Sequence, residues 1–301
     1  MGKRLYISCI LLVVALPATS SASPVVFQVG GSDDPASIQA TVDVFRAALG
    51  SPNNGNAPGP LPAGRREINW DGGGSVINAP VGTPFDGFMD SRGARFVTPG
   101  TGFVQAPASA GGGNDDLGTF FGNPTYDGIF GSFSPQRLFA PVGSNITDVH
   151  FFVPGTVGGV AAEVSGFGAV FSDVDLADSA ELQFFDTDGN LLYADFVSEG
   201  TVGDASLSFL GVVFDGGERV SRVRITSGTQ GLGGGSNDDP LHGTDLVAMD
   251  DFLYSEPLAA AHVVPEPAAW VLFVAGAMAI FAVGAIRPRL AGAAPTSRPR
   301  R

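Results

Sequence analysis

Glycine and proline punctuate this chain throughout its length and restrict it to short structural elements. The sequence holds 43 Gly and 22 Pro among 301 residues. Both residue types interrupt helices and are frequent in turns, so their scattered distribution favours short strands over long helices. The 23 Phe argue against disorder, because a disordered chain lacks the aromatic surface that builds a core. A chain of this length suffices for one large domain or two small ones.

Several short apolar segments separated by turn residues predict β-strands. The pattern dominates from about Gly102 onward, where a subdivision of the body is possible. One turn, Asp186-Thr187-Asp188-Gly189, joins two such segments and is typical of a hairpin. Seven or more strands of this kind indicate a mainly β fold, an antiparallel β-sandwich. The expected strands cover residues 25–29, 145–153, 161–171, 181–185, 190–196, 206–214, 220–226 and 247–254.

One packed helix is expected near the N-terminus of this body. Asp34 can cap it, Pro35 suits its first position, and Gly50 suits its end. Within it, four apolar residues recur at helical spacing and form a narrow stripe that should pack on a sheet. These are Ile38, Val42, Phe45 and Leu49.

The first 22 residues have the pattern of a secretory signal peptide. Lys3 and Arg4 precede an apolar run from Leu5 to Leu16, and small residues follow. We expect cleavage after Ala22, which leaves residues 23–260 as an exported body. The only cysteine, Cys9, lies inside the removed segment, so the mature chain has no thiol for a disulfide.

The C-terminal segment, residues 261–301, also reads as a targeting element. Pro265-Glu266-Pro267 precedes an uncharged stretch over residues 268–286, followed by Arg287 and Arg289. As a helix this stretch is about 28 Å long, enough to cross a membrane. The arginines favour a cytoplasmic basic tail over residues 291–301, with the body outside.

This order of elements over residues 261–290 resembles the PEP-CTERM sorting signal of Gram-negative bacteria. The resemblance implies that the export machinery and a transpeptidase-like membrane enzyme, the exosortase, are partners of the chain. It also implies attachment at the cell envelope, the cell surface or an extracellular matrix. One departure is that the tail continues beyond Arg289. A plain single-span anchor is the alternative interpretation.

Charge excludes one class of partner for the exported body. Between residues 24 and 264 the chain has nine arginines against 29 aspartates and glutamates, a net charge of −20. Such a body has no basic face that could release counterions from phosphates, so we exclude nucleic-acid binding. The acidic excess suits extracellular solubility, cation binding or both.

Motifs for catalysis are absent from the sequence. It has no Gly-x-Ser-x-Gly elbow, and its three histidines show no zinc spacing. Carboxylate pairs cannot be assigned among so many acidic residues. Trp70 and the adjacent Arg65-Arg66-Glu67 offer a test, because a deep pocket lined by them would favour an enzyme. We therefore expect a non-catalytic surface or matrix protein that binds extracellular polysaccharide, with an exported hydrolase of polysaccharide or ester substrates as the alternative.

The expected strand that ends the body carries a further resemblance. Together with the preceding strands, Ala248-Met249-Asp250-Asp251-Phe252-Leu253-Tyr254 resembles the closing strand of jelly-roll carbohydrate-binding modules. That resemblance implies a structural calcium site that uses one aspartate of the pair, because side chains alternate along a strand. Further oxygens would come from Asp245 and from the segment that ends at Asp239. A solvated acidic loop is the alternative.

Overall fold

The computed structural model describes residues 23–72, 77–108, 115–156 and 158–260. The expected signal peptide, the expected sorting motif at Pro265-Glu266-Pro267, and the expected span with Arg287 and Arg289 lie outside these ranges. Within them, no helix has the length and apolar character needed to cross a membrane. The described body is mainly β with few helices, and all its named strand pairs are antiparallel, which confirms the expected fold class at this level.

The first sheet is built around β15 (Ala248–Ser255), the last long strand of the body. One side of β15 pairs with β10, whereas the other pairs with β7 through Met249 and with β2 through the segment from Phe252 to Ser255. The order across this sheet is β1-β13-β10-β15-β7-β6-β3, with β2 beside β15. Its other strands are β1 (Val25–Gly30), β2 (Arg65–Ile68), β3 (Asn78–Val81), β6 (Gly102–Pro107), β7 (Arg137–Val142), β10 (Gly166–Ser172) and β13 (Leu207–Val213).

The second sheet has six strands in the order β12-β11-β14-β8-β5-β4. Its hairpin β11–β12 turns at Asp186, whose carboxylate accepts hydrogen bonds from the N–H groups of Asp188 and Asn190, as the sequence predicts. Beside the two sheets, β9 (Ala162–Glu163) pairs with β16 (Leu258–Ala259). The strands of the second sheet are β4 (Phe85–Phe88), β5 (Ala94–Val97), β8 (Ile146–Phe151), β11 (Glu181–Phe185), β12 (Leu191–Phe196) and β14 (Arg222–Thr226).

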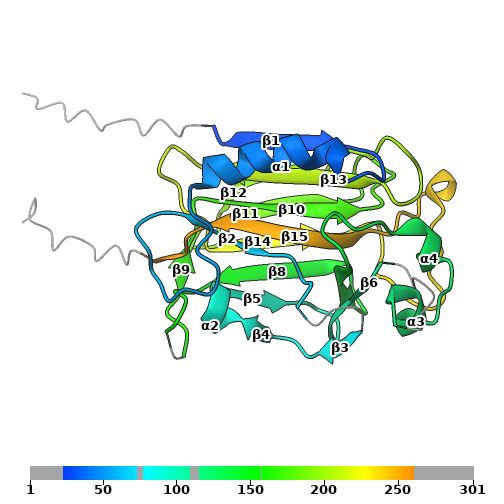
Figure 1. Cartoon of the computed structure of the whole chain (residues 1–301), viewed down its shortest axis with the longest axis horizontal. Helices are drawn as coiled ribbons and strands as arrows, with labels where there is room; N and C mark the ends of the chain where they lie inside the picture. The colour runs from blue at the N-terminus through cyan, green and yellow to red at the C-terminus, as the bar shows by residue number, and fades with distance from the viewer. Residues whose placement is uncertain (1–22, 73–76, 109–114, 157, 261–301) are drawn as a thin grey trace, which may run out of the picture. The chain divides into compact units, whose positions relative to one another are not determined.

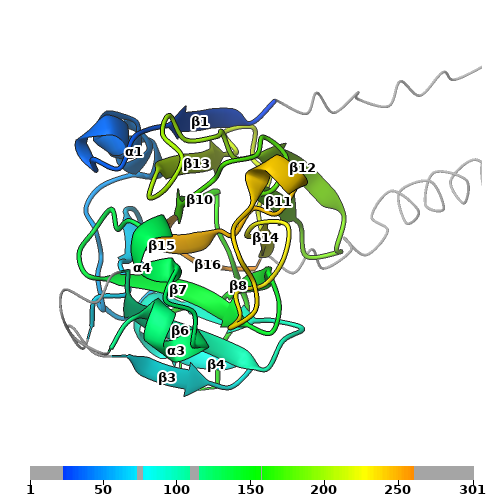
Figure 2. The same ribbon diagram turned by 90° about the vertical axis from the view of Figure 1, so that its right-hand side faces the viewer.

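The two sheets face each other across one hydrophobic core (Figure 1, Figure 2). Trp70 stacks on Phe139 with 3.8 Å between ring centroids, and Phe96 of β5 packs against both rings. Both sheets therefore contribute to a single sandwich-like body. Residues before and after position 102 share both sheets, because β2 pairs with β15 and β5 pairs with β8.

Helix α1 (Ala36–Leu49) covers the outer face of the first sheet. Its buried residues are Ile38, Val42, Phe45 and Leu49, the stripe that the sequence predicts. The Asp34 carboxylate accepts the N–H of Ala36 at 2.9 Å and caps the first turn, and Gly50 ends the helix. The remaining helices of the described ranges are short: α2 (Met89–Arg92), α3 (Leu117–Phe121), α4 (Tyr126–Ile129) and the 3₁₀ turn η1 (Pro240–His242).

The sequence-based strand boundaries hold best after residue 181. The expected strand over residues 161–171 is two strands, β9 and β10, because Val164 leaves the sheet path and bridges Val220. Strands β2 to β7 and β16 were not predicted. Each of these has two to six residues and lacks a clear apolar alternation, as in Arg65–Ile68 and Asn78–Val81.

Candidate functional site: an acidic triad beside the first sheet

Three carboxylates from two loops meet where β10 ends. Asp173 and Asp175 follow β10 directly, and Asp238 lies in the loop before β15. Because β10 and β15 are antiparallel and Ser172 pairs with Ala248, the end of one strand lies beside the start of the other. One oxygen atom from each carboxylate lies within 4.8 Å of the other two. We call Asp173, Asp175 and Asp238 the acidic triad.

Asp173 is the buried member of the acidic triad. Its backbone has a φ of 71°, a left-handed conformation that is uncommon for aspartate, and its N–H donates to the carbonyl of Ser206 at 2.8 Å. One carboxylate oxygen accepts the N–H of Ala205 at 3.1 Å. The other, Oδ2, is buried without a hydrogen-bond partner. A buried carboxylate oxygen without a hydrogen-bond partner is costly, so this atom favours the binding of a cation or a proton.

A fourth carboxylate, Asp245, holds the loop that carries Asp175. Its Oδ2 accepts the N–H groups of Asp175 at 3.0 Å and Leu176 at 2.9 Å, and the hydroxyl of Ser179. Its Oδ1 is buried without a partner. Asp238 accepts the N–H of Leu246 at 2.9 Å, which fixes its loop against the start of β15. Hydrogen bonds from backbone N–H groups to carboxylate oxygens therefore hold the loops that carry Asp175 and Asp238.

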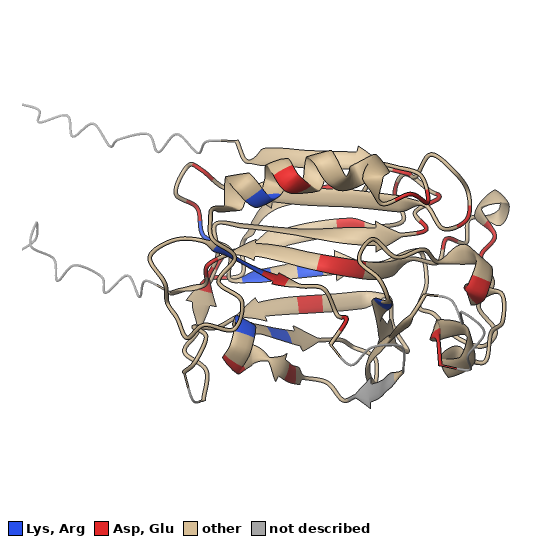
Figure 3. Ribbon diagram, in the orientation of Figure 1, with Lys and Arg blue, Asp and Glu red and all other residues tan. Residues whose placement is uncertain are grey.

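Acidic residues gather on the loops at this end of the sandwich, so four separate anions would repel one another strongly there (Figure 3). Burial, together with the charges of Asp175, Asp238 and Asp245, raises the pKa of Asp173 to about 9. Burial and the neighbouring carboxylates raise the pKa of Asp175 to about 7. Burial also raises the pKa of Asp238. Among the described residues, no arginine forms an ion pair with the triad.

A divalent cation would neutralise this cluster. Hard cations such as Ca²⁺ bind carboxylate and carbonyl oxygens at 2.3–2.6 Å, so two ligands of one ion are at most about 5 Å apart. The oxygens of the acidic triad meet that limit. The residues present therefore suit a hard cation, with Asp173, Asp175 and Asp238 as its protein ligands.

The residues predicted as metal ligands from the sequence are distributed over three places. Asp245 lies beside the acidic triad. Asp239 is exposed, and its carboxylate contacts the His242 ring nitrogen Nδ1 at 2.7 Å. Asp250 and Asp251 contact a different part of the chain, around Ser134.

The expectation that Asp250 and Asp251 face opposite sides of their strand is wrong. The register of β10 against β15 pairs Ala169 with Phe252 and Phe171 with Met249, so both aspartates lie opposite the single residue Val170. This is a β-bulge, which turns both carboxylates to the same face. The Ser134 Oγ lies 3.3 Å from Asp250 Oδ1 and 2.6 Å from Asp251 Oδ1.

Protein groups satisfy this carboxyl cluster, which we define as Asp71, Asp250 and Asp251 around Ser134. The Asp71 Oδ2 lies 3.2 Å from the Ser134 Oγ. Asp250 Oδ2 accepts the N–H of Phe133 at 2.7 Å, and Asp251 Oδ2 pairs with Arg46 of α1 at 3.4 Å. Burial, followed by the charge of Asp251, raises the pKa of Asp250 well above its usual range. The cluster fastens α1 and the segment before β7 to β15.

The sequence stretch Arg65-Arg66-Glu67 with Trp70 has a structural role. Trp70 is 1% exposed and donates its indole N–H to the carbonyl of Asp250 at 2.9 Å. Arg66 is fully buried and forms two hydrogen bonds of 2.7 Å to Glu256. Both side chains are buried and paired within the body, so their placement does not favour the hydrolase alternative.

Sequence reasoning missed Asp173 and Asp175, two of the three triad members. The spacing Asp173-Val174-Asp175 directly after an apolar strand is the signal that could have identified them. In such a pattern the two aspartates leave the strand end on the same side while Val174 remains in the core. No model of a protein family, no curated protein and no solved structure matches this chain.

Proposed function

We propose that this chain is an exported, non-catalytic surface or matrix protein whose β body holds a structural calcium ion and binds extracellular polysaccharide. The observation that carries the calcium part is the acidic triad with the buried, unpaired Oδ2 of Asp173. Extracellular media supply calcium. The net charge of −20 over residues 24–264 favours solubility of the body in such media.

The proposed location of the protein at the cell envelope rests on its sequence. The order Pro265-Glu266-Pro267, uncharged stretch and arginines supports sorting by an exosortase at a Gram-negative envelope. The N-terminal segment supports export before that step. We further propose a jelly-roll relationship for the sandwich, supported by neighbours that are distant in sequence, such as β10 beside β15 and β8 beside β14.

The dependence of thermal stability on calcium tests whether the acidic triad binds this ion. A ligand present at a hundred times its Kd stabilises a fold by about 2.7 kcal/mol, which corresponds to about 5–10 °C in Tm for a body of this size. We expect this shift for the full chain in mild detergent when calcium replaces EDTA, and a smaller shift with magnesium. Asp173→Asn should abolish the shift, whereas Asp188→Asn in the exposed hairpin turn should keep it. Equal melting in calcium and EDTA would overturn the calcium proposal.

A further inference from the structure

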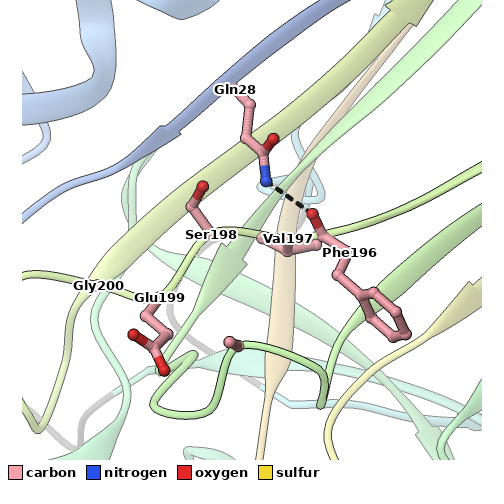
Figure 4. Close-up of a pocket in the computed structure, with 7 residues that line it drawn as sticks. Gln28, Phe196, Val197, Ser198, Glu199 and Gly200 are labelled. Atoms are coloured by element: carbon pink, nitrogen blue, oxygen red, sulfur yellow. Dashed lines mark hydrogen bonds between the residues drawn. The ribbon is translucent and has the colours of Figure 1, made fainter.

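A pocket of about 480 Å³ opens beside β1 and the end of β12. Its volume falls in the range of small-ligand sites, which is about 300–1,000 Å³. Figure 4 shows the Phe196 ring and the Glu199 carboxylate extending to the two sides of the buried Val197, with Gln28 of β1 nearby. The pocket is lined by Gln28, Ala177, Phe196, Val197, Ser198, Glu199 and Gly200.

The backbone beneath this pocket is held on three sides. The N–H groups of Val197, Gly200 and Thr201 donate to carbonyls of Ala180, Val174 and Gly31 at 2.9, 2.8 and 2.8 Å. Strand β1 also approaches closely, because a Cβ at Gly30 would lie 1.7 Å from the carbonyl oxygen of Glu199. A site fixed in this way loses little conformational entropy when a ligand binds.

The groups that face the pocket accept hydrogen bonds. The side-chain amide of Gln28 donates to the carbonyl of Phe196 at 2.6 Å, which leaves its own carbonyl oxygen for a ligand. Glu199 is exposed and adds a carboxylate, and the lining that the described ranges contribute holds no basic residue. Phe196 is 43% exposed, which is unusual for a phenylalanine and provides a flat apolar surface. A ligand with one apolar face and several hydrogen-bond donors matches these groups, as a sugar ring does.

The negative charge near the pocket determines which charge a bound sugar can carry. Gly200, next to Glu199 in the pocket wall, donates its N–H to the carbonyl of Val174 at 2.8 Å, and Val174 lies between Asp173 and Asp175. Ala177 of the pocket wall lies two residues from Asp175 in the loop that Asp245 holds. The charge of Glu199 and this acidic neighbourhood attract a cationic ligand and oppose a uronate or sulfated sugar.

We propose that this pocket binds a sugar unit that carries an ammonium group, with Glu199 as its counter-ion and Phe196 as its stacking surface. The inference rests on the proposed polysaccharide binding and names the sugar class for it. The ammonium and ring hydroxyls would donate to Glu199 and to the Gln28 carbonyl oxygen, and the C–H face of the ring would lie on Phe196.

Calorimetric titration of the full chain in mild detergent with saturating calcium tests this proposal. The probes are a glucosamine hexamer at pH 6, its fully N-acetylated counterpart and a hexamer of galacturonate. We expect the glucosamine hexamer to bind at least about tenfold more tightly than the acetylated one, and galacturonate not to bind. Glu199→Gln should weaken glucosamine binding about tenfold, as expected for a lost charged hydrogen bond. Phe196→Ala should weaken it about three- to tenfold.

Two controls separate this inference from the proposed function. Asp188→Asn removes an exposed carboxylate outside the pocket lining and should leave glucosamine binding unchanged. Glycan binding that survives both Glu199→Gln and Phe196→Ala would overturn the pocket assignment while polysaccharide binding stands. Absence of binding by every glycan on a broad array would overturn both, and preferred binding of galacturonate would overturn the charge argument.

Discussion

Calcium binding at the acidic triad should depend steeply on pH. In the calcium-free fold the Asp173 carboxyl has a pKa of about 9, so at pH 7 it holds a proton that calcium must displace. Two pH units below that pKa, the displacement costs about 3 kcal/mol. The apparent Kd for calcium should therefore fall about a hundredfold between pH 7 and pH 9, one decade per pH unit. Below pH 7 the slope should steepen, because Asp175, with a pKa of about 7, adds a second proton.

The sign of the stability effect follows from the same groups. Asp173 and Asp175 have folded pKa values above their usual 3.8, so the calcium-free fold binds more protons than the unfolded chain. The stability that these protons give is complete below about pH 4 and is lost as the pH rises toward about 9. Calcium replaces the protons, and the gain in Tm on calcium addition should grow over this interval.

Isothermal titration calorimetry between pH 6 and pH 9, in buffers of different ionisation enthalpy, measures both the Kd and the protons released. At pH 7 to 8 we expect at least one proton per calcium ion. Asp173→Asn should weaken binding and lower the number of released protons, and Asp188→Asn should change neither. A Kd that stays constant from pH 7 to pH 9 would refute the assignment of Asp173 as a protonated ligand.

Three further predictions concern stability and processing. Arg66→Met should lower the free energy of unfolding by about 3–5 kcal/mol, because it leaves Glu256 buried without its counter-ion. In urea unfolding, the double variant with Glu256→Leu should recover most of this loss. Phe45→Ala should lower the free energy of unfolding by about 3–5 kcal/mol. Val44→Ala, on the exposed face of α1, should change it by less than about 0.5 kcal/mol. Similar losses for the two variants would argue against the packing of α1. Native protein from an exosortase-containing host should begin near Ser23 and yield no peptide beyond about residue 270 in mass spectrometry; intact C-termini would indicate a plain anchor.

The elements that could be predicted from the sequence are those whose signals are local. Helix α1 combines a cap at Asp34, Pro35 and a four-residue apolar stripe, and the structure confirms it. The hairpin at Asp186 is likewise specified by its own turn residues. Strands such as β2 (Arg65–Ile68) carry two arginines among four residues, so only their pairing with β15 makes them strands. Pairing between distant segments is not visible in a local pattern.

The candidate site was only partly predictable for a similar reason. The acidic density before β15 indicated a cation site, but its members depend on which loops meet. Asp173 and Asp175 lie more than sixty positions from Asp238 in the chain and come close because β10 and β15 are neighbours. The bulge at Asp250 and Asp251 breaks strand alternation and redirects both side chains. A one-residue irregularity of this kind leaves no mark in the sequence.

The position of β15 determines when this body is able to fold during its synthesis. Without β15, the first sheet consists of two separate pieces, β1-β13-β10 and β7-β6-β3, and β2 has no strand partner. A chain that emerges N-terminus first must therefore wait until residue 255 is available before the pieces join. A chain that ends before β15 leaves the edges of β10 and β7 without this partner strand, and open strand edges are recognised by chaperones and proteases. Under the proposed export and sorting, completion of the sheet coincides with the arrival of residues 261–301, so only full-length molecules reach the sorting step folded.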